Sequence, residues 1–280
     1  MDVSPILAAL GYTEPVPEVT QFRAEEDGRP YEVWKVGNKV LKKTSPEEKQ
    51  VYETFLSAGG PGPKVYAFGE YAGQLYMLME YVSGTSMSIV TRQRLQRTLD
   101  VLIESQKKYW GDTVHTDAGY SFAKSWPNRV KRLAFMGDLQ DAYQAYLDVF
   151  ASVPRTLCND DMLPFNVLAD DDRAVIIDWE YAGILPYPCA LARFLAFGEE
   201  NPEEMFYMTA EDKAFALDYY YRNLVAEKGI SREEFDRAME LFFFKEYSEW
   251  IYCDAICDEE VEYVRKYGPM ARELAKKLGF

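Results

Sequence analysis

Three oxygen-bearing side chains frame a short apolar region in the stretch NDDMLPFNVLADDDRAVIIDWE, namely Asp161, Asn166 and Asp178. Within this stretch the apolar runs VLA and AVII are separated by DDDR, a pattern that predicts a β-hairpin. A hairpin brings its two ends together, so we expect Asn166 and Asp178 to lie side by side at its open end. Asp161, five residues before Asn166, should lie in the loop that leads into the hairpin.

These side chains suit a site for a metal ion and a proton acceptor. The carboxylate of Asp178 and the amide oxygen of Asn166 are hard ligands for Mg²⁺, which keeps few protein ligands and completes its shell with water and phosphate oxygens. Asp161 would then be free to accept a proton from a nucleophile. The alternative is that all three are ordinary turn residues, as we expect for the acids of DDDR. The position of Asp178 after a buried strand favours function, because a charge there needs a partner.

The first 80 residues must form the elements on one side of this site. Residues 19–24, 31–36 and 39–43 read as an antiparallel meander of strands, with EEDGR and GN at the turns. Ser45 is a plausible N-cap for a helix that ends at Gly59 and Gly60. The segments KVYAFGEY and QLYMLMEYV then predict two further strands.

Helical patterns dominate after the segment SGTSM. The expected helices span residues 92–110, 129–135, 139–149, 190–197, 210–228, 232–256 and 259–278. We therefore expect an α+β protein of two lobes: a small antiparallel-sheet lobe (1–80), a hinge (81–84) and a larger, mainly helical lobe (85–280).

Composition restricts the class of partner. The formal net charge of −15 argues against nucleic acid and against anionic membranes, and favours a cationic small molecule. No apolar run of about 18 residues is present and the N-terminus does not resemble a secretory signal, so we expect no membrane partner and a cytoplasmic protein. Four scattered cysteines and one histidine argue against a zinc site. The sequence does not indicate an oligomeric state.

Taken together, NDDMLPFNVL and IIDWEYAG resemble the aminoglycoside phosphotransferase and choline kinase-like family, whose loops read H-x-D-x-x-x-x-N and then I-D-W-E. The pieces DGRPYEVWKV, KVLKK, SPEEKQVY, GPKVYAFGE and LYMLMEYVSG follow in the family's order, so the resemblance covers nearly the whole chain. It implies a bilobal protein kinase-like fold that binds ATP (or GTP) and Mg²⁺ between the lobes. The implied activity is transfer of the γ-phosphate to a hydroxyl of a small, cationic acceptor, aminoglycoside-like or choline-like.

The resemblance also implies roles for the loop residues and for one strand lysine. Asp161 would be the catalytic base, and Asn166 and Asp178 would hold magnesium. Lys42 would contact the α- and β-phosphates and pair with Glu48. Two neighbours are the alternatives: Lys43, which must point to the opposite face of the strand, and Glu47.

Other expected nucleotide contacts lie in a turn and in the hinge. The turn EEDGR, around Asp27 and Gly28, would cover the triphosphate. The hinge of Met79 to Val82, with Glu80 and Val82 among the contacts, would read the adenine through backbone groups.

The chain departs from the family pattern at two supports of the loop. Asn159 stands where the family's loop opens with histidine, and Pro186 and Ala190 stand where two aspartates are expected. An asparagine can still donate and accept hydrogen bonds. The alternative function is therefore a catalytically degenerate kinase-like module that binds a nucleotide or a protein.

The acceptor is expected to be a small molecule, because no long activation segment follows Asp178. Candidate acceptor contacts are Glu249, Trp250 and Asp254 on the expected helix 232–256, with Glu199 and Glu200 as further acids. Acids beside an aromatic ring suit an ammonium group. A solvated helix face with Trp250 in the core is the alternative.

Overall fold

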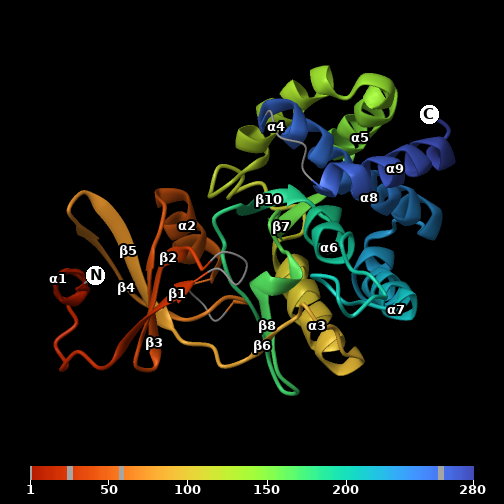
Figure 1. Cartoon of the computed structure of the whole chain (residues 1–280). Coiled ribbons are helices and arrows are strands. Elements are labelled where there is room, and N and C mark those ends of the chain that lie inside the picture. The colour runs from red at the N-terminus through yellow and green to blue at the C-terminus, as the bar shows by residue number, and fades with distance from the viewer. Residues whose placement is uncertain (1, 24–27, 57–59, 258–261) are drawn as a thin grey trace.

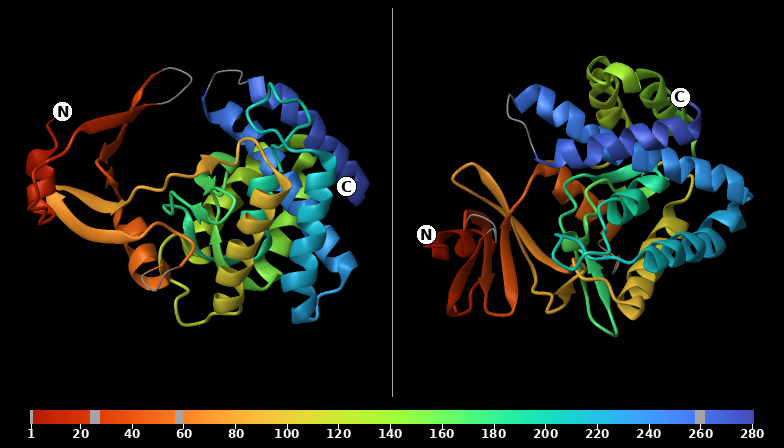
Figure 2. Two further views of the ribbon diagram at one scale, coloured as in Figure 1. Left: turned by 90° about the horizontal axis from the view of Figure 1, so that it is seen from below. Right: turned by 45° about the vertical axis from the view of Figure 1, so that its right-hand side comes forward.

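The chain forms two lobes, a smaller one built on a sheet and a larger one built mostly of helices. A computed structural model describes residues 2–23, 28–56, 60–257 and 262–280. The sheet lobe and the helical lobe meet along the middle of the molecule (Figure 1), and two further views show the same division (Figure 2). The expected bilobal α+β architecture is thus confirmed.

The small lobe contains a five-stranded antiparallel sheet in the order β1-β2-β3-β5-β4. Its strands are β1 (Val19–Arg23), β2 (Pro30–Val36), β3 (Lys39–Lys43), β4 (Val65–Tyr71) and β5 (Gln74–Glu80). Helix α2 (Pro46–Val51) follows β3, and the Ser45 side chain caps it by accepting a hydrogen bond from the Glu48 amide. A short helix, α1 (Ser4–Ala9), was not expected from the sequence; its Ile6 and Leu7 are buried in the small-lobe core.

The connection between the lobes passes close to the hairpin that follows residues 160–166, which we call the acidic loop. After β5, the chain pairs as β6 (Thr85–Ser86) with β8 (Val167–Ala169), which pairs in turn with β9 (Ala174–Ile176). A Cβ atom on Gly84 would lie 2.9 Å from the backbone nitrogen of Ala169, so only glycine fits this approach.

The large lobe consists mainly of seven described helices. They are α3 (Arg92–Tyr109), α4 (Phe122–Arg132), α5 (Gln140–Ser152), α6 (Pro188–Leu195), α7 (Ala210–Tyr220), α8 (Arg232–Cys257) and α9 (Glu262–Leu278). The expected helix 129–135 was wrong in its start: α4 begins at Phe122, where Ser121 caps it, and it contains Pro127. Residues 259–261 of the last expected helix lie outside the described residues. None of the helices described is both long and apolar enough to cross a bilayer.

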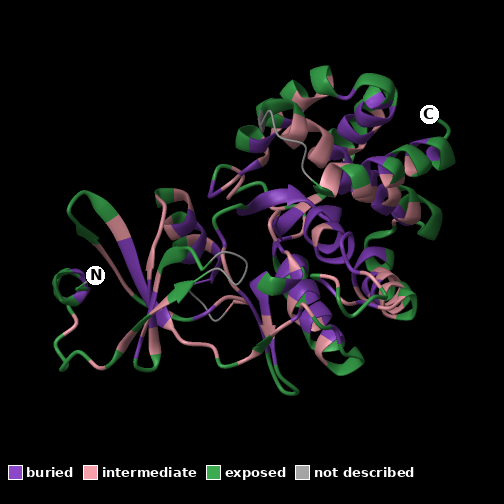
Figure 3. Ribbon diagram, in the orientation of Figure 1, coloured by how far each residue is buried: buried purple, intermediate pink, exposed green. Residues whose placement is uncertain are grey.

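A two-stranded sheet that the sequence did not predict lies beneath the acidic loop. It pairs β7 (Arg155–Asn159) with β10 (Ala182–Pro186) in antiparallel register, with Asn159 opposite Ala182. Both strands are almost entirely buried, as the burial colouring shows for this region (Figure 3). The acidic loop therefore starts from a rigid, buried strand.

Candidate active site

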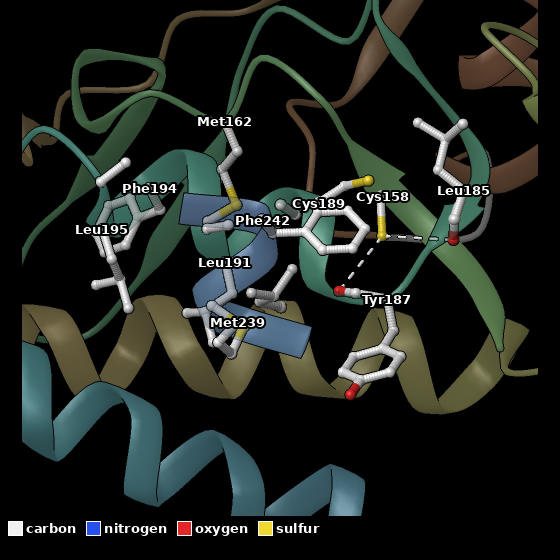
Figure 4. Packing of buried hydrophobic residues seen from close by; sticks show 14 of the residues in the cluster. Cys158, Met162, Leu185, Tyr187, Cys189, Leu191, Phe194, Leu195, Met239 and Phe242 are labelled. Atoms are coloured by element: carbon white, nitrogen blue, oxygen red, sulfur yellow. Dashed lines mark hydrogen bonds between the residues drawn. The ribbon is translucent and has the colours of Figure 1, made fainter. Parts of the chain in front are cut away.

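The acidic loop is anchored from below by apolar packing. Met162, within the loop, is fully buried and packs near Phe242 of α8 and Leu191 of α6 (Figure 4). Cys158, at the end of β7, is buried in the same cluster, and burial raises the pKa of its thiol to about 12. Cys158 is therefore a packing residue, and the cluster around it fixes the position of the loop.

Asn166 is oriented by its contact with Asp161. Its Nδ2 donates to the backbone oxygen of Asp161 at 2.8 Å and lies 3.3 Å from Asp161 Oδ2. The Asn166 backbone oxygen accepts from Ile177, the residue before Asp178, at 2.8 Å. The hairpin thus brings the Asn166 and Asp178 backbones together, as its pattern predicts, and turns the amide oxygen of Asn166 away from Asp161.

Asp178 has an unusual backbone conformation for a residue with a side chain. Its φ is 57°, in the left-handed region that aspartate tolerates better than most residues but that still costs energy. The Asp178 carboxylate is 43% exposed, and its Oδ1 accepts from Lys42 Nζ at 2.8 Å. Backbone strain of this kind is concentrated at functional sites, where the surrounding structure holds it in place.

Lys42 lies at the centre of a three-residue contact between the lobes. Its Nζ also donates to Glu48 Oε1 at 2.7 Å, and that oxygen accepts from the Trp179 backbone at 3.1 Å. The Glu48 side chain is only 1% exposed. Burial alone would lower the pKa of Lys42, but Glu48 and Asp178 outweigh it and the pKa is raised. Lys42 therefore stays charged.

The two alternative residues point elsewhere. Lys43 Nζ pairs with Glu32 on the exposed face of the sheet at 2.8 Å, and Glu47 pairs with Lys124 at 3.5 Å. Of the four residues considered from the sequence, Lys42 and Glu48 are the pair that the structure brings to Asp178.

Asn159 links the two segments that carry the acids. Its Nδ2 donates to the backbone oxygen of Asp178 at 2.8 Å, and its Oδ1 accepts from the backbone nitrogen of Asp161 at 3.0 Å. Ala190 is fully buried in α6. The asparagine thus fixes the loop relative to the hairpin by a hydrogen-bond network that needs neither a histidine at 159 nor an aspartate at 190.

Asp161 has a partner that the sequence analysis missed. Arg193 of α6 donates from Nη2 to Asp161 Oδ1 at 2.9 Å and from Nη1 to Glu246 Oε2 at 2.8 Å. Burial raises the pKa of Asp161, and the attraction of Arg193 only partly offsets this, so the pKa lies above its ordinary value. Nothing in the local sequence ALARF marks Arg193 as a partner of a loop 32 residues away.

Asp160 and Glu249 belong to a buried ion-pair network beside the loop. The carboxylate of Asp160 pairs with Arg129, and Lys245 lies 3.6 Å from its other oxygen. Glu249 pairs with Arg129 at 3.3 Å, with Lys245 at 3.4 Å and with Arg132. The carboxylate that was expected to meet a cationic acceptor is therefore surrounded by cations of the chain itself.

The other acceptor candidates lie farther along α8 and in the segment after α6. Trp250 packs against Tyr263 of α9 with ring centroids 4.9 Å apart, and Asp254 is half-buried one turn later. Glu199 pairs with Lys266 at 2.5 Å, and Glu200 accepts from the Ala210 backbone.

The expected nucleotide contacts occupy the small lobe and the hinge. Gly28 is exposed with a φ of 69°, and Arg23 donates to its carbonyl; residues 24–27 of that turn lie outside the described residues. The Glu80 side chain pairs with Arg173 of the large lobe at 2.5 Å. A cavity of about 70 Å³ is lined by Glu80, Val82 and their neighbours in the connection.

The ligand atoms available near Asp178 fit magnesium. No described residue donates to Asn166 Oδ1 or to Asp178 Oδ2, so a carboxylate oxygen and an amide oxygen remain open. Within the described chain no three His, Cys, Asp or Glu side chains form a complete metal site. Magnesium does not require one, because water and phosphate oxygens complete its shell.

A much larger cavity, of about 970 Å³, lies between α3 and β4, and its lining includes Tyr52, Phe68 and Val101. Lys42, Asp161 and Asp178 do not line it. The candidate chemistry therefore lies outside this cavity, where Lys42 pairs with Asp178 and Asn159 links the Asp178 backbone to that of Asp161.

Comparisons with known proteins agree with this arrangement. Among curated proteins, no relative matched the chain. The structure is similar to that of an aminoglycoside-3'-phosphotransferase of type VIII, with 19% identity, a TM-score of 0.57, and coverage of 85% of this chain and 97% of the other. It is similar to choline kinase LicA from Streptococcus pneumoniae, with 17% identity, a TM-score of 0.59, and coverage of 98% and 96%.

A third similar structure is a thermostable mutant of aminoglycoside phosphotransferase APH(4)-Ia in a ternary complex with ADP and hygromycin B. It shares 15% identity and a TM-score of 0.61, and the match covers 98% of each chain. Likeness at these identities establishes the protein kinase-like fold. The model of the phosphotransferase enzyme family matches residues 18–222, which is most of the chain. The chain therefore belongs to the phosphotransferase enzyme family.

Proposed function

We propose that this protein transfers the γ-phosphate of ATP, or GTP, to a hydroxyl group of a small cationic molecule. The observation that carries the proposal is that Lys42, Asp161 and Asp178 come from three separate segments to one junction between the lobes: Lys42 pairs with Asp178, and Asn159 links the Asp178 backbone to that of Asp161. These are the residue types that phosphoryl transfer requires, since positioning and electrostatic stabilisation dominate its catalysis.

Each side chain has a distinct part in the proposed reaction. Lys42, kept charged by Glu48, offsets negative charge on the α- and β-phosphates. Asn166 and Asp178 would hold magnesium, which supplies further charge neutralisation on the triphosphate when bound. Asp161 accepts the proton of the acceptor hydroxyl and orients its oxygen toward the γ-phosphorus.

Nucleotide binding is supported by the elements around this junction. Glu80 and Val82 of the hinge line a small cavity, and Gly28 lies between β1 and β2, in the turn that we expect to cover the triphosphate. Two of the similar solved structures contain ADP together with a second small molecule, hygromycin B in the ternary complex described above and streptomycin in the other. We infer that this chain likewise binds a nucleotide and a small molecule together.

A cationic acceptor is supported by the net charge of −15 and by Trp250 and Asp254, whose ring and carboxylate suit an ammonium group. Glu249 is neutralised within the chain, so we assign it to structural support and not to direct acceptor contact. The acceptor could be aminoglycoside-like or choline-like, because both carry cationic nitrogen and a free hydroxyl.

The test is a phosphoryl-transfer assay with purified protein, ATP or GTP, and Mg²⁺. The acceptor panel contains aminoglycosides, choline, ethanolamine, neutral sugars and nucleosides. Phosphorylation of a cationic acceptor that falls to a small residual rate on Asp161→Asn substitution supports the proposal. Magnesium-dependent nucleotide binding without transfer to any acceptor would instead support the degenerate, binding-only function.

A further inference from the structure

The Asp161 carboxylate is held by two residues from outside the loop, which we call the Arg193–Glu246 pair. Arg193 of α6 reaches it at 2.9 Å, and Glu246 of α8 holds Arg193 at 2.8 Å. The Glu246 side chain is fully buried, and its second oxygen accepts from Lys245 at 2.8 Å. Arg193 is thus fixed at both ends of its guanidinium group, a geometry that a flexible surface pair does not have.

The Arg193–Glu246 pair is part of an ion-pair network in which the number of cations equals the number of carboxylates. Its cations are Arg129, Arg132, Arg193 and Lys245, and its carboxylates are those of Asp160, Asp161, Glu246 and Glu249. Asp161 is the member that combines contact with this network and contact with Asn166. A buried network of this kind is rigid only while each group keeps its partners.

The contacts of Asp161 distinguish its two oxygens. Oδ1 is engaged by Arg193 at 2.9 Å, whereas Oδ2 has a longer contact of 3.3 Å with Asn166. With Oδ1 held toward α6, rotation of the carboxylate is restricted and Oδ2 is the oxygen left for the acceptor hydroxyl. If Oδ2 were held as tightly as Oδ1, its partner would compete with the acceptor hydroxyl. The weaker contact of Oδ2 therefore suits a catalytic base.

We propose that Arg193, held by Glu246, is a positioning residue that sets the orientation of the Asp161 carboxylate for phosphoryl transfer. This inference rests on the proposed function, because it assigns Asp161 the part of the base. Arg193 acts through Asp161 and contacts neither the nucleotide nor the acceptor. Its removal should slow the transfer step and leave nucleotide binding intact.

The first test compares Arg193→Gln and Arg193→Lys with the parent protein. Misplacing a catalytic group by about 1 Å can cost about 100-fold, so we expect kcat to fall about 10- to 100-fold in Arg193→Gln, with the KM for ATP within about twofold. Arg193→Lys keeps the charge and should restore part of the loss. Arg272→Gln, which removes an exposed pair with Asp138, is the matched control and should retain parental kcat.

The second test combines Arg193→Gln with Asp161→Asn. If Arg193 acts through Asp161, the double variant should have the same residual transfer rate as Asp161→Asn alone. A kcat for Arg193→Gln within about twofold of the parent, or an equal loss in both backgrounds, would overturn the proposal. Arg193→Gln/Glu246→Gln keeps the network electrically balanced, and provides a folded protein should Arg193→Gln alone unfold.

A denaturation cycle separates this inference from the proposed function. The shifts in urea midpoint for Arg193→Gln, Asp161→Asn and the double variant should be non-additive, because the two side chains share a contact. Additive shifts would disprove the coupling even in an active enzyme. Absence of transfer by the parent to every acceptor would refute the proposed function, and the cycle would still decide whether Arg193 holds Asp161.

Discussion

Lys42 of the small lobe and Asp178 of the large lobe form an ion pair of 2.8 Å that crosses the junction between the lobes. Asp178 follows the hairpin of the large lobe, whereas Lys42 lies on β3 opposite Met77 of β5. The same lysine is held by the buried Glu48. The Lys42 ammonium group therefore connects the two lobes at the site.

Replacing this lysine should weaken nucleotide binding. Lys42→Met removes charge-assisted contacts each worth about 1.5–3 kcal/mol, so we expect the dissociation constant for ATP, measured by calorimetry, to rise about 10- to 100-fold. Lys43→Met is the control, since Lys43 pairs with Glu32 on the exposed face. Equal ATP affinity of the two variants would contradict the role of Lys42.

Because Lys42→Met leaves the Glu48 carboxylate buried without its cation, thermal unfolding must be followed in parallel. Loss of one partner of a buried pair costs about 3–5 kcal/mol. Lys42→Met/Glu48→Gln removes the uncompensated charge and should recover most of the stability without recovering the affinity for ATP. Recovery of both would assign Lys42 to folding alone.

Substitution of Asn159 should affect stability and turnover together. Asn159→Ala leaves the Asp178 carbonyl and the Asp161 amide without partners in a buried place, at about 1–3 kcal/mol each. We expect a lower melting temperature and a lower kcat. Asn159→His restores a ring donor and should keep more activity than Asn159→Ala; parental kcat and stability in Asn159→Ala would show that the link is dispensable.

The stability of the network beside the loop should depend on pH in the acid range. Burial raises the pKa of Asp160, but Arg129 and then Lys245 outweigh this and lower the pKa to about 2, below its ordinary value of 3.8. The folded pKa is below the unfolded one, so the contribution of Asp160, about 2–3 kcal/mol, is complete above about pH 4. It is lost as the pH falls from about 4 to about 2.

Urea unfolding of the parent and of Asp160→Asn at several pH values measures this contribution. The difference in unfolding free energy should be largest near neutral pH and should shrink as the pH falls toward 2. Asp138→Asn, which removes an exposed pair, should differ from the parent by about 0–1 kcal/mol at neutral pH. A constant difference for Asp160→Asn from pH 7 to 2 would contradict the assignment.

Features that depend on neighbouring residues could be predicted from the sequence. The hairpin after Asn166, the cap at Ser45 and the opposite directions of Lys42 and Lys43 all follow from local rules of turns, caps and strand alternation. These rules also predicted the order of the five strands and helix α2 in the small lobe correctly. They depend only on residues close together in the sequence.

Features that depend on distant partners were missed. Strand β10 contains Gly183 and ends at Pro186, so it lacks a local strand signal and is defined by its pairing with β7, a distant segment. Arg193 and Glu246 are 53 residues apart, and Arg129 and Glu249 are 120 apart. The sequence predicted the acidic face of α8 but not the cations that neutralise Glu249.

Substitutions at Asp178 can distinguish the effect of its strained backbone on stability from the effect of its carboxylate on function. Its φ of 57° is easy for glycine and costs a residue with a Cβ about 1 kcal/mol or more. Asp178→Gly should therefore unfold at a higher temperature than Asp178→Ala, which keeps the strain and loses the carboxylate. Both variants lose the oxygen proposed to hold magnesium, so Mg²⁺ should no longer increase ATP affinity, and transfer should cease in both. Asp178→Asn keeps the side-chain length and serves as the matched control for charge. Magnesium-dependent ATP binding that persists in Asp178→Gly would show that the conformation is maintained for some purpose other than the carboxylate it presents.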